Sequence, residues 1–355
     1  MFMRENELLA PYTTFGIGGP ARWFAHVTSE DELASAVAWA RERGVPLFVV
    51  GGGSNLLVAD AGFDGLVLHV GLRGIESEEE GAAGSRVYRA AAGEDWDAFV
   101  RRTVEDQCAG LECLAGIPGT VGGTPVQNVG AYGQEVATAI ERVRAFDLER
   151  QAFVEFTAAE CGFAYRRSRF NTTDRGRYVV TRVDYRLTPG GAPTVRYADL
   201  QRALEQSHGE GAAPTLVEVA AAVRRVRQVK GMLLVEGEPD CRSAGSFFKN
   251  PVVTVEIYQK IAAQGAAPPT FPAGPEAEHA GCVKLPAAWL IEHAGFHKGY
   301  AKGNAGISTR HTLALMNRGG ATAAEIVALA ERIAEAVEAQ FGIRLEMEPV
   351  KVGFA

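Results

Sequence analysis

The sequence predicts an α/β protein, and three observations support this fold class. Near the N-terminus a strand-like segment (22–27), an amphipathic helix and a second, buried strand (46–50) follow one another, and a glycine loop begins directly after the second strand. From residue 86 to about residue 187, short strand patterns alternate with short helices. The 355 residues are 47% hydrophobic, which suffices for a large core and excludes disorder as the main state. The length predicts two or three domains, at roughly 100–200 residues each.

Capping residues define the first helix. Ser29 and Glu32 have the spacing of a capping box, and Gly44 is placed to end the helix. One face of the helix is apolar and consists of Leu33, Val37 and Ala40.

Similar signals define a helix near the C-terminus. Thr322 and Glu325 form a second capping box, and Gly342 ends the helix. Its apolar face consists of Ile326, Leu329, Ile333 and Val337. We expect a strand over residues 343–352, and a helix through the segment that begins at Leu216.

Charge and composition exclude several classes of protein. With 36 Lys and Arg against 43 Asp and Glu, the net charge is −7, whereas proteins that bind nucleic acids are usually basic. No apolar run reaches the roughly 18 residues of a membrane span, and the N-terminus lacks the apolar core of a signal peptide. Five cysteines without a C-x-x-C pair indicate reduced thiols and a cytoplasmic location. The histidines and cysteines show no metal-binding spacing, so no metal is expected, and Cys108 and Cys113 are expected to be small buried residues.

Glycine is the unusual component of the composition, with 41 residues. Four regions are dense in it, namely 16–19, 51–53, 116–133 and 303–306. Residues 16–21 match G-x-G-x-x-A, but they lead into a strand and not into a helix, so a turn between strands is the better interpretation. Region 303–306 has no evident function.

The loop of Gly51, Gly52 and Gly53 follows a buried strand and is followed by Ser54 and Asn55. Successive glycines allow backbone N–H groups to point into one concavity that suits phosphate oxygens. A tight turn without a ligand is the alternative, and it is the default for an isolated run of three glycines. The loop is not a Walker motif, because no Gly-Lys-Ser/Thr follows.

The segment 116–133 contains six glycines, two prolines and no charged residue. Such a segment can bring backbone close to a large, flat ligand. By itself it predicts a pocket lined by backbone. Together with the loop at 51–53, it suggests a nucleotide that carries a ring system.

Several polar residues are candidates for the site. Arg166 can hold a carboxylate or phosphate in bidentate fashion, whereas Arg167 and Arg169 are expected in a solvated turn. Arg227 and Lys230 are spaced to face one anion from a helix, although a solvated helix face is the usual alternative.

Two more candidates lie in the C-terminal third of the chain. Ser246 follows a glycine and precedes two aromatic residues, so it is either a proton donor or a serine at the end of a strand. Glu348 lies between apolar residues, so it is either an acid–base group or a glutamate on an edge strand.

Seven segments, in this order, resemble those of the UDP-N-acetylenolpyruvoylglucosamine reductase family of flavoenzymes. They include VVGGGSNLLVADAGFDGLV, AGIPGTVGGTPVQNVGAYGQEV, FAYRRSRF, AGSFFKNP and LEMEPVKVG, and the full set extends from residue 6 to residue 353. The insertion at about 257–281 is similar to that of the longer, type I branch. One departure is that Gly-Met follows Lys230, where many relatives have Leu-Pro.

The resemblance implies an FAD-binding fold of the vanillyl-alcohol-oxidase type. It implies an FAD-binding domain over 1–228, in subdomains of about 1–75 and 76–228, completed by 342–355. A separate α/β substrate-binding domain is expected over 229–341.

The resemblance also implies roles for residues. Arg166, Ser246 and Glu348 match the catalytic residues, and Tyr197, Lys230 and Asn250 match contacts to the substrate. The expected contacts to the cofactor are Gly51, Gly52, Gly53, Ser54, Asn55, Gly116, Pro118, Gly119, Thr120, Gly122, Gly123, Asn128, Ala131, Tyr132, Gly133 and Arg227.

The implied activity is the reduction of UDP-N-acetylglucosamine enolpyruvate to UDP-N-acetylmuramate, with NADPH as hydride donor and non-covalent FAD. This reaction belongs to peptidoglycan precursor synthesis and therefore to cell-wall biogenesis, cell shape and division. The expected partners are these small molecules, with no nucleic acid and no membrane, and a monomer is expected. Two alternatives stay open: another flavin oxidoreductase of the same fold, and a non-catalytic module that binds a UDP-sugar.

Overall fold

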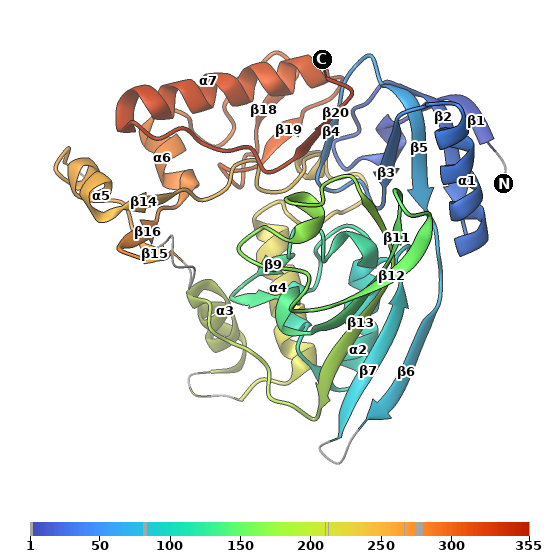
Figure 1. The fold of residues 1–355 in the computed structure, drawn as a ribbon. Coiled ribbons are helices and arrows are strands. Elements are labelled where there is room, and N and C mark those ends of the chain that lie inside the picture. Colours follow the sequence, from blue (N-terminus) through green and yellow to red (C-terminus); the bar gives the residue numbers. More distant parts are fainter. Residues whose placement is uncertain are drawn as a thin grey trace. The chain divides into compact units, whose positions relative to one another are not determined.

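The computed structural model describes residues 3–80, 84–209, 211, 213–265, 267–273 and 280–354. The chain folds into two compact units (Figure 1). The first unit comprises residues 1–7, 21–53 and 63–229, and the second comprises 8–20, 54–62 and 230–355. Each unit has a hydrophobic core of its own.

The first unit contains a small sheet with strand order β1-β2-β5-β3, in which β5 pairs in parallel with both β2 and β3. Its strands are β1 (Met3–Leu8), β2 (Pro20–Val27), β3 (Leu47–Val50) and β5 (Phe63–Val70). Helix α1 (Glu30–Glu42) connects β2 to β3 and contributes its apolar face to the core (Figure 1). The strand–helix–strand start expected from the sequence is confirmed.

Helix α1 begins and ends where its capping residues predict, with one difference. The Ser29 hydroxyl accepts the N–H of Glu32 at 3.2 Å, as a capping box requires. The Glu32 carboxylate, however, accepts the N–H of Thr28 at 2.8 Å instead of that of Ser29. The helix ends before Gly44, whose φ of 62° suits glycine.

A larger antiparallel sheet has the order β12-β11-β13-β7-β6, with the short β8 beside β13. Its strands are β6 (Ile75–Glu80), β7 (Ser85–Ala91), β8 (Cys108–Ala109), β11 (Ile140–Asp147), β12 (Ala152–Thr157) and β13 (Tyr178–Pro189). The unit also contains α2 (Trp96–Glu105), α3 (Ala198–His208), α4 (Leu216–Val229) and a hairpin of β9 (Gly130–Ala131) and β10 (Gln134–Glu135). Trp96, Phe99 and Tyr185 are buried in its core, and Cys108 and Cys113 are buried as expected.

The described residues of the second unit form short strands and three α-helices. The strands are β4 (Leu56–Val58), β14 (Val252–Thr254), β15 (Phe271–Pro272), β16 (Cys282–Lys284), β17 (Ala301–Lys302), β18 (Ala305–Ile307), β19 (Leu315–Asn317) and β20 (Val350–Val352). The helices are α5 (Val255–Ala262), α6 (Ala287–His293) and α7 (Ala323–Phe341). The long helix α7 packs beside β18 and β19 (Figure 1).

The start of α7 is held by three side chains. Thr322 and Glu325 form the predicted capping box. The Asp60 carboxylate adds two acceptors, for the N–H of Ala323 at 2.7 Å and for that of Ala324 at 3.1 Å. At the other end Gly342 adopts the left-handed conformation, as predicted.

The glycine region 303–306, which had no evident function, forms the turn between β17 and β18. A Cβ at Gly303 would lie 2.5 Å from Glu325 Oε1, and the same oxygen accepts the N–H of Asn304. The glycine is therefore needed because this turn packs against the cap of α7.

The expectation of a strand over 343–352 is wrong for most of its length, because only Val350–Val352 forms a strand, in parallel with β4. Residues 346–348 instead make isolated backbone contacts with 247–249. Residues 342–355 lie in the same compact unit as 54–62 and 230–341. The functional division into FAD-binding and substrate-binding domains stays a prediction.

No helix among the described residues is both long and apolar enough to cross a membrane. The insertion expected at about 257–281 contains part of α5, β15 and the start of the turn before β16. Residues 266 and 274–279 of it lie outside the described part.

We predict that Asp60→Ala lowers the free energy of unfolding by about 1–2 kcal/mol, because two N–H groups at the start of α7 lose a negatively charged acceptor. Urea unfolding followed by circular dichroism measures the change. Asp64→Ala is the matched control, since Asp64 has 83% of its side chain exposed and makes only a surface ion pair with Arg22. That variant should change stability by less than about 0.5 kcal/mol. Equal losses in the two variants would contradict the capping role.

Candidate active site

Two of the predicted glycine loops meet in the first unit. The loop at 51–53 follows β3, and the segment at 116–133 follows β8 and a 3-10 turn over Glu112–Leu114. A Cβ added to Gly52 would lie 2.5 Å from the Cα of Gly119, and a Cβ added to Gly51 would lie 2.5 Å from Thr120 Oγ1. At Gly52 only glycine permits this approach of one backbone to the other, and at Gly51 only glycine leaves room for the Thr120 hydroxyl.

The meeting loops leave a row of backbone donors without acceptors. Within the described part of the chain, the N–H groups of Gly51, Gly52, Gly53, Gly119 and Thr120 form no hydrogen bond. Successive backbone N–H groups without acceptors can bind an anion. These residues therefore fit the pyrophosphate of a dinucleotide such as FAD, as the sequence predicts.

The start of the second loop is anchored at Gly116. Its N–H donates to Asp97 Oδ1 at 2.5 Å, and its carbonyl accepts from Arg227 Nε at 2.9 Å. Arg227 lies in the last turn of α4 and is only 8% exposed. Burial lowers the pKa of Arg227, while Tyr132 and Asp97 act in the opposite direction. The loop continues past Gly122, where a Cβ would lie 2.6 Å from that of Ala92.

Three of the six described non-glycine residues with left-handed backbone are predicted site residues. Asn128, Tyr132 and Arg166 have φ values of 45°, 51° and 56°, in the left-handed region that non-glycine residues rarely adopt. The Arg166 guanidinium donates to the carbonyl of Gly130 at 2.7 Å. Strained residues of this kind are common at ligand-binding sites, where the surrounding contacts hold them in place.

The side chain of Asn128 is occupied by the protein. It is 1% exposed, donates to Glu135 Oε2 and to the Ala164 carbonyl, and accepts from the N–H of Ala137. Its side chain therefore holds the β9–β10 hairpin in place. The predicted contact of Asn128 with a cofactor stays a prediction.

The hairpin turn brings two predicted tyrosines together. Tyr132 follows Ala131 and precedes the exposed Gly133. Its ring meets that of Tyr197 edge-on, with 5.5 Å between ring centroids. Tyr197 is 38% exposed and lies directly before α3, so its position is compatible with contact to a bound ligand.

Glu112 and Cys113 hold the segment before Tyr197, a role that no motif predicted. Buried Glu112 accepts the N–H of Thr194 at 2.8 Å, and the Cys113 thiol donates to the carbonyl of Thr194 at 2.9 Å. Both lie in an ordinary LEC sequence without a motif, so no sequence signal identifies them. These two hydrogen bonds join residues that are 81 and 82 positions apart in the sequence.

In the second unit, Ser246 and Glu348 lie on neighbouring segments. The N–H of Glu348 donates to the carbonyl of Phe247 at 2.9 Å, and Phe248 bridges to Met347. Both phenylalanines are 1% exposed, so they anchor the segment while Ser246 stays half-buried. The Ser246 hydroxyl makes no hydrogen bond with any described residue, so its proton is available.

Two predicted asparagines hold backbone in the second unit. The side-chain amide of Asn55 donates to the backbone carbonyl of Glu348 at 3.3 Å. The backbone carbonyl of Asn55 accepts the N–H of Val350. Asn250 Oδ1 accepts the N–H of Ala287 at the start of α6, at 2.9 Å. Ser54 and Asn55 belong to the second unit, whereas the three glycines before them belong to the first.

Arg227 lies in the last turn of α4, whereas Lys230 follows directly after the end of this helix. That both residues face one anion stays a prediction. Lys230 is half-buried in the second unit. Burial, together with the positive charges of Lys230 and Lys298, lowers the pKa of His311 to about 4. His311 is therefore neutral near pH 7.

The expectation of a solvated turn holds for Arg167, which is exposed, and is wrong for Arg169. Arg169 pairs with Asp174 at 2.7 Å and lies over the ring of Phe156, 4.2 Å from its centroid. An aromatic cluster beneath the turn explains the difference, since an arginine stacks well on such rings.

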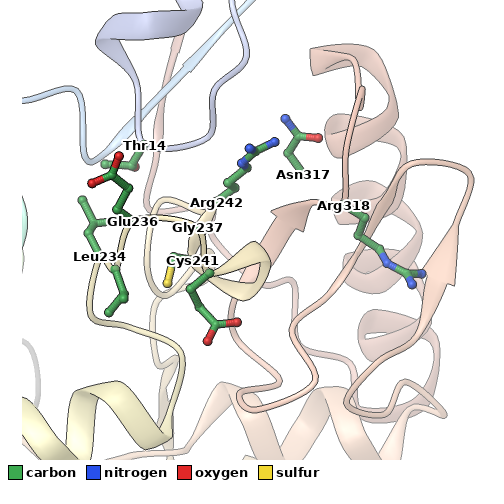
Figure 2. A pocket seen from close by; sticks show the side chains of 10 residues that line it. Thr14, Leu234, Glu236, Gly237, Cys241, Arg242, Asn317 and Arg318 are labelled. Atoms are coloured by element: carbon green, nitrogen blue, oxygen red, sulfur yellow. The ribbon is translucent and has the colours of Figure 1, made fainter.

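A cavity of about 350 Å³ lies within the second unit. Figure 2 shows Thr14, Glu236 and Arg242 among the side chains that line it. None of the predicted catalytic, cofactor or substrate residues lines this cavity. The cavity is therefore distinct from the segment that carries Ser246 and Glu348.

The chain has clear relatives. A family model described as "UDP-N-acetylenolpyruvoylglucosamine reductase, C-terminal domain" matches residues 238–352, and one described as "FAD binding domain" matches residues 21–149. The UDP-N-acetylenolpyruvoylglucosamine reductase of Thermobifida fusca is 47% identical over 357 residues, which cover 98% of each chain. That of Streptomyces coelicolor is 46% identical and covers 98% of this chain and 89% of the relative.

A crystal structure of the reductase from Thermus caldophilus aligns with a TM-score of 0.67 at 28% identity, covering 99% of this chain and 100% of the other. With the match to the FAD-binding model, it confirms the FAD-binding fold expected from the sequence. The extent and level of these similarities show that the chain belongs to the UDP-N-acetylenolpyruvoylglucosamine reductase family.

Proposed function

We propose that this protein uses NADPH and non-covalently bound FAD to reduce UDP-N-acetylglucosamine enolpyruvate to UDP-N-acetylmuramate. The observation that carries the proposal is the row of unpaired N–H groups where residues 51–53 meet Gly119 and Thr120, in a chain of this reductase family. The proposal includes a cytoplasmic location, a monomeric state and a role in peptidoglycan precursor synthesis.

The donor set suits FAD chemically. Five backbone N–H groups offer hydrogen bonds to the two phosphates, and buried Arg227 supplies a positive charge. When bound, FAD accepts hydride from NADPH and transfers it to the double bond of the enolpyruvyl group. The protein supplies the binding, orientation and charge around that chemistry.

Arg166, Ser246 and Glu348 are the proposed catalytic residues. Arg166 holds the substrate carboxylate, where its positive charge stabilises the negative charge that develops during reduction. Its contact with the Gly130 carbonyl orients the guanidinium. Ser246 Oγ donates the proton that completes the new C–H bond, and Glu348 contributes a hydrogen bond to the same region.

Substrate contacts are proposed for Tyr197, Lys230 and Asn250. Asn250 uses its Oδ1 to cap α6, and its amide nitrogen has no acceptor among the described residues. That nitrogen can donate to an oxygen of the substrate. Lys230 supplies a positive charge suited to the diphosphate of a UDP-sugar.

The proposal is tested by releasing flavin from purified protein by denaturation and by measuring NADPH oxidation with and without the enolpyruvyl UDP-sugar. We expect a yellow protein and oxidation that depends on the sugar nucleotide. Flavin with sugar-independent oxidation would favour another flavin oxidoreductase. A protein that neither retains nor takes up FAD would favour a non-catalytic module that binds a UDP-sugar.

We predict that Ser246→Ala slows reoxidation of the flavin by the enolpyruvyl substrate roughly 10²-fold or more, because the proton donor is lost. Reduction of the flavin by NADPH should stay close to the wild-type rate. Stopped-flow absorbance separates the two half-reactions. Ser35→Ala, at an exposed serine of α1, is the control and should leave both rates unchanged. Unchanged reoxidation in Ser246→Ala would remove Ser246 from the reaction.

We predict that Tyr197→Phe raises the KM for the enolpyruvyl substrate about tenfold, because one hydrogen bond to it is lost while the ring contact with Tyr132 is kept. Flavin reduction by NADPH should change less. Tyr178→Phe is the control, since Tyr178 packs against Phe156 and Phe170 in the core of the first unit. Equal effects of Tyr197→Phe on both half-reactions would argue against contact with the substrate.

A further inference from the structure

We propose that Asp97 is a positioning residue that holds the start of the glycine segment 116–133 and sets the local charge at the FAD site. The proposal rests on the proposed FAD function. Asp97 lies outside the sequence motifs described above. Its contacts connect α2, the glycine segment and α4.

Asp97 uses both carboxylate oxygens. It lies in the first turn of α2, where Oδ1 accepts the N–H of Gly116 at 2.5 Å. Oδ2 pairs with Arg224 Nη1 on α4. The Asp97 side chain is 22% exposed, so these contacts are partly shielded from solvent and are stronger than a surface ion pair.

Asp97 and Arg227 hold Gly116 from both sides. Asp97 binds the N–H of Gly116, and Arg227 Nε donates to the carbonyl of the same residue at 2.9 Å. Gly116 has a φ of 72°, so this backbone bend relies on glycine and on the two contacts. Gly119 and Thr120 follow within four residues of Gly116. The two contacts that hold Gly116 therefore also fix the position of the unpaired N–H groups of Gly119 and Thr120.

Asp97 also balances positive charge. Arg227 is buried in this region, and the negative charge of Asp97 raises its pKa against the lowering effect of burial. A cationic guanidinium near a bound flavin favours the reduced cofactor, which carries more negative charge than the oxidised form. The negative charge of Asp97 weakens this preference for the reduced flavin. The positive charge of Arg224 in turn partly neutralises that of Asp97.

The two partners of this ion pair therefore make opposite predictions. Asp97→Asn removes a negative charge, so the midpoint potential of the bound flavin should rise. It also weakens the hold on Gly116, and we expect the Kd for FAD to increase roughly tenfold. Arg224→Gln removes a positive charge and leaves the Asp97–Gly116 hydrogen bond, so the midpoint potential should fall with little change in the Kd.

The experiment uses full-length holoenzyme. The midpoint potential is measured by spectrophotometric titration against a reference dye, and the Kd by titrating FAD into protein freed of flavin. Glu105→Gln is the matched control, because it removes the same charge from an exposed position on α2. We expect this control to match the wild type in both measurements. Asp97→Glu keeps the charge and should return the potential close to the wild-type value.

Shifts of opposite sign in Asp97→Asn and Arg224→Gln, with an unchanged control, would support the proposal. Equal potentials in all variants, or shifts of the same sign, would overturn it. If Asp97→Asn does not fold, Arg224→Gln still decides, because 42% of the Arg224 side chain is exposed. A wild-type protein that binds no FAD would instead refute the proposed function, so the two failures are distinguishable.

Discussion

The close approach of two glycine loops shapes the whole region proposed to bind FAD. Gly52 packs against the backbone of Gly119, and Gly51 packs against the Thr120 side chain, so a Cβ at either glycine would collide. At this contact the N–H groups of Gly51, Gly52, Gly53, Gly119 and Thr120 have no acceptors among the described residues.

The proposed catalytic side chains rely on contacts made by their neighbours. Arg166 has a left-handed backbone and donates to the carbonyl of Gly130, while Asn128 ties that hairpin to the Ala164 carbonyl. In the second unit, two buried phenylalanines anchor the segment after Ser246. Strain at the functional positions is therefore offset by buried packing and hydrogen bonds nearby.

Local signals predicted much of the secondary structure. Thr322, Glu325 and Gly342 marked both ends of α7, because capping acts over three or four residues of sequence. The strand expected at 343–352 was wrong because backbone pairing with 247–249 replaced regular strand geometry over 346–348. Sequence also did not reveal Asp60, whose contact with α7 joins residues 263 positions apart.

The family, the FAD-binding fold and the glycine loops follow from the sequence without any coordinates, because ordered motifs and local conformational preferences are written in consecutive residues. The side chains that hold those loops became apparent only in the folded chain. There Asp97 and Arg227 bind Gly116, and Asn128 and Asn55 hold backbone. Such contacts join segments far apart in the chain, so they depend on how the strands and helices pack and not on any local pattern.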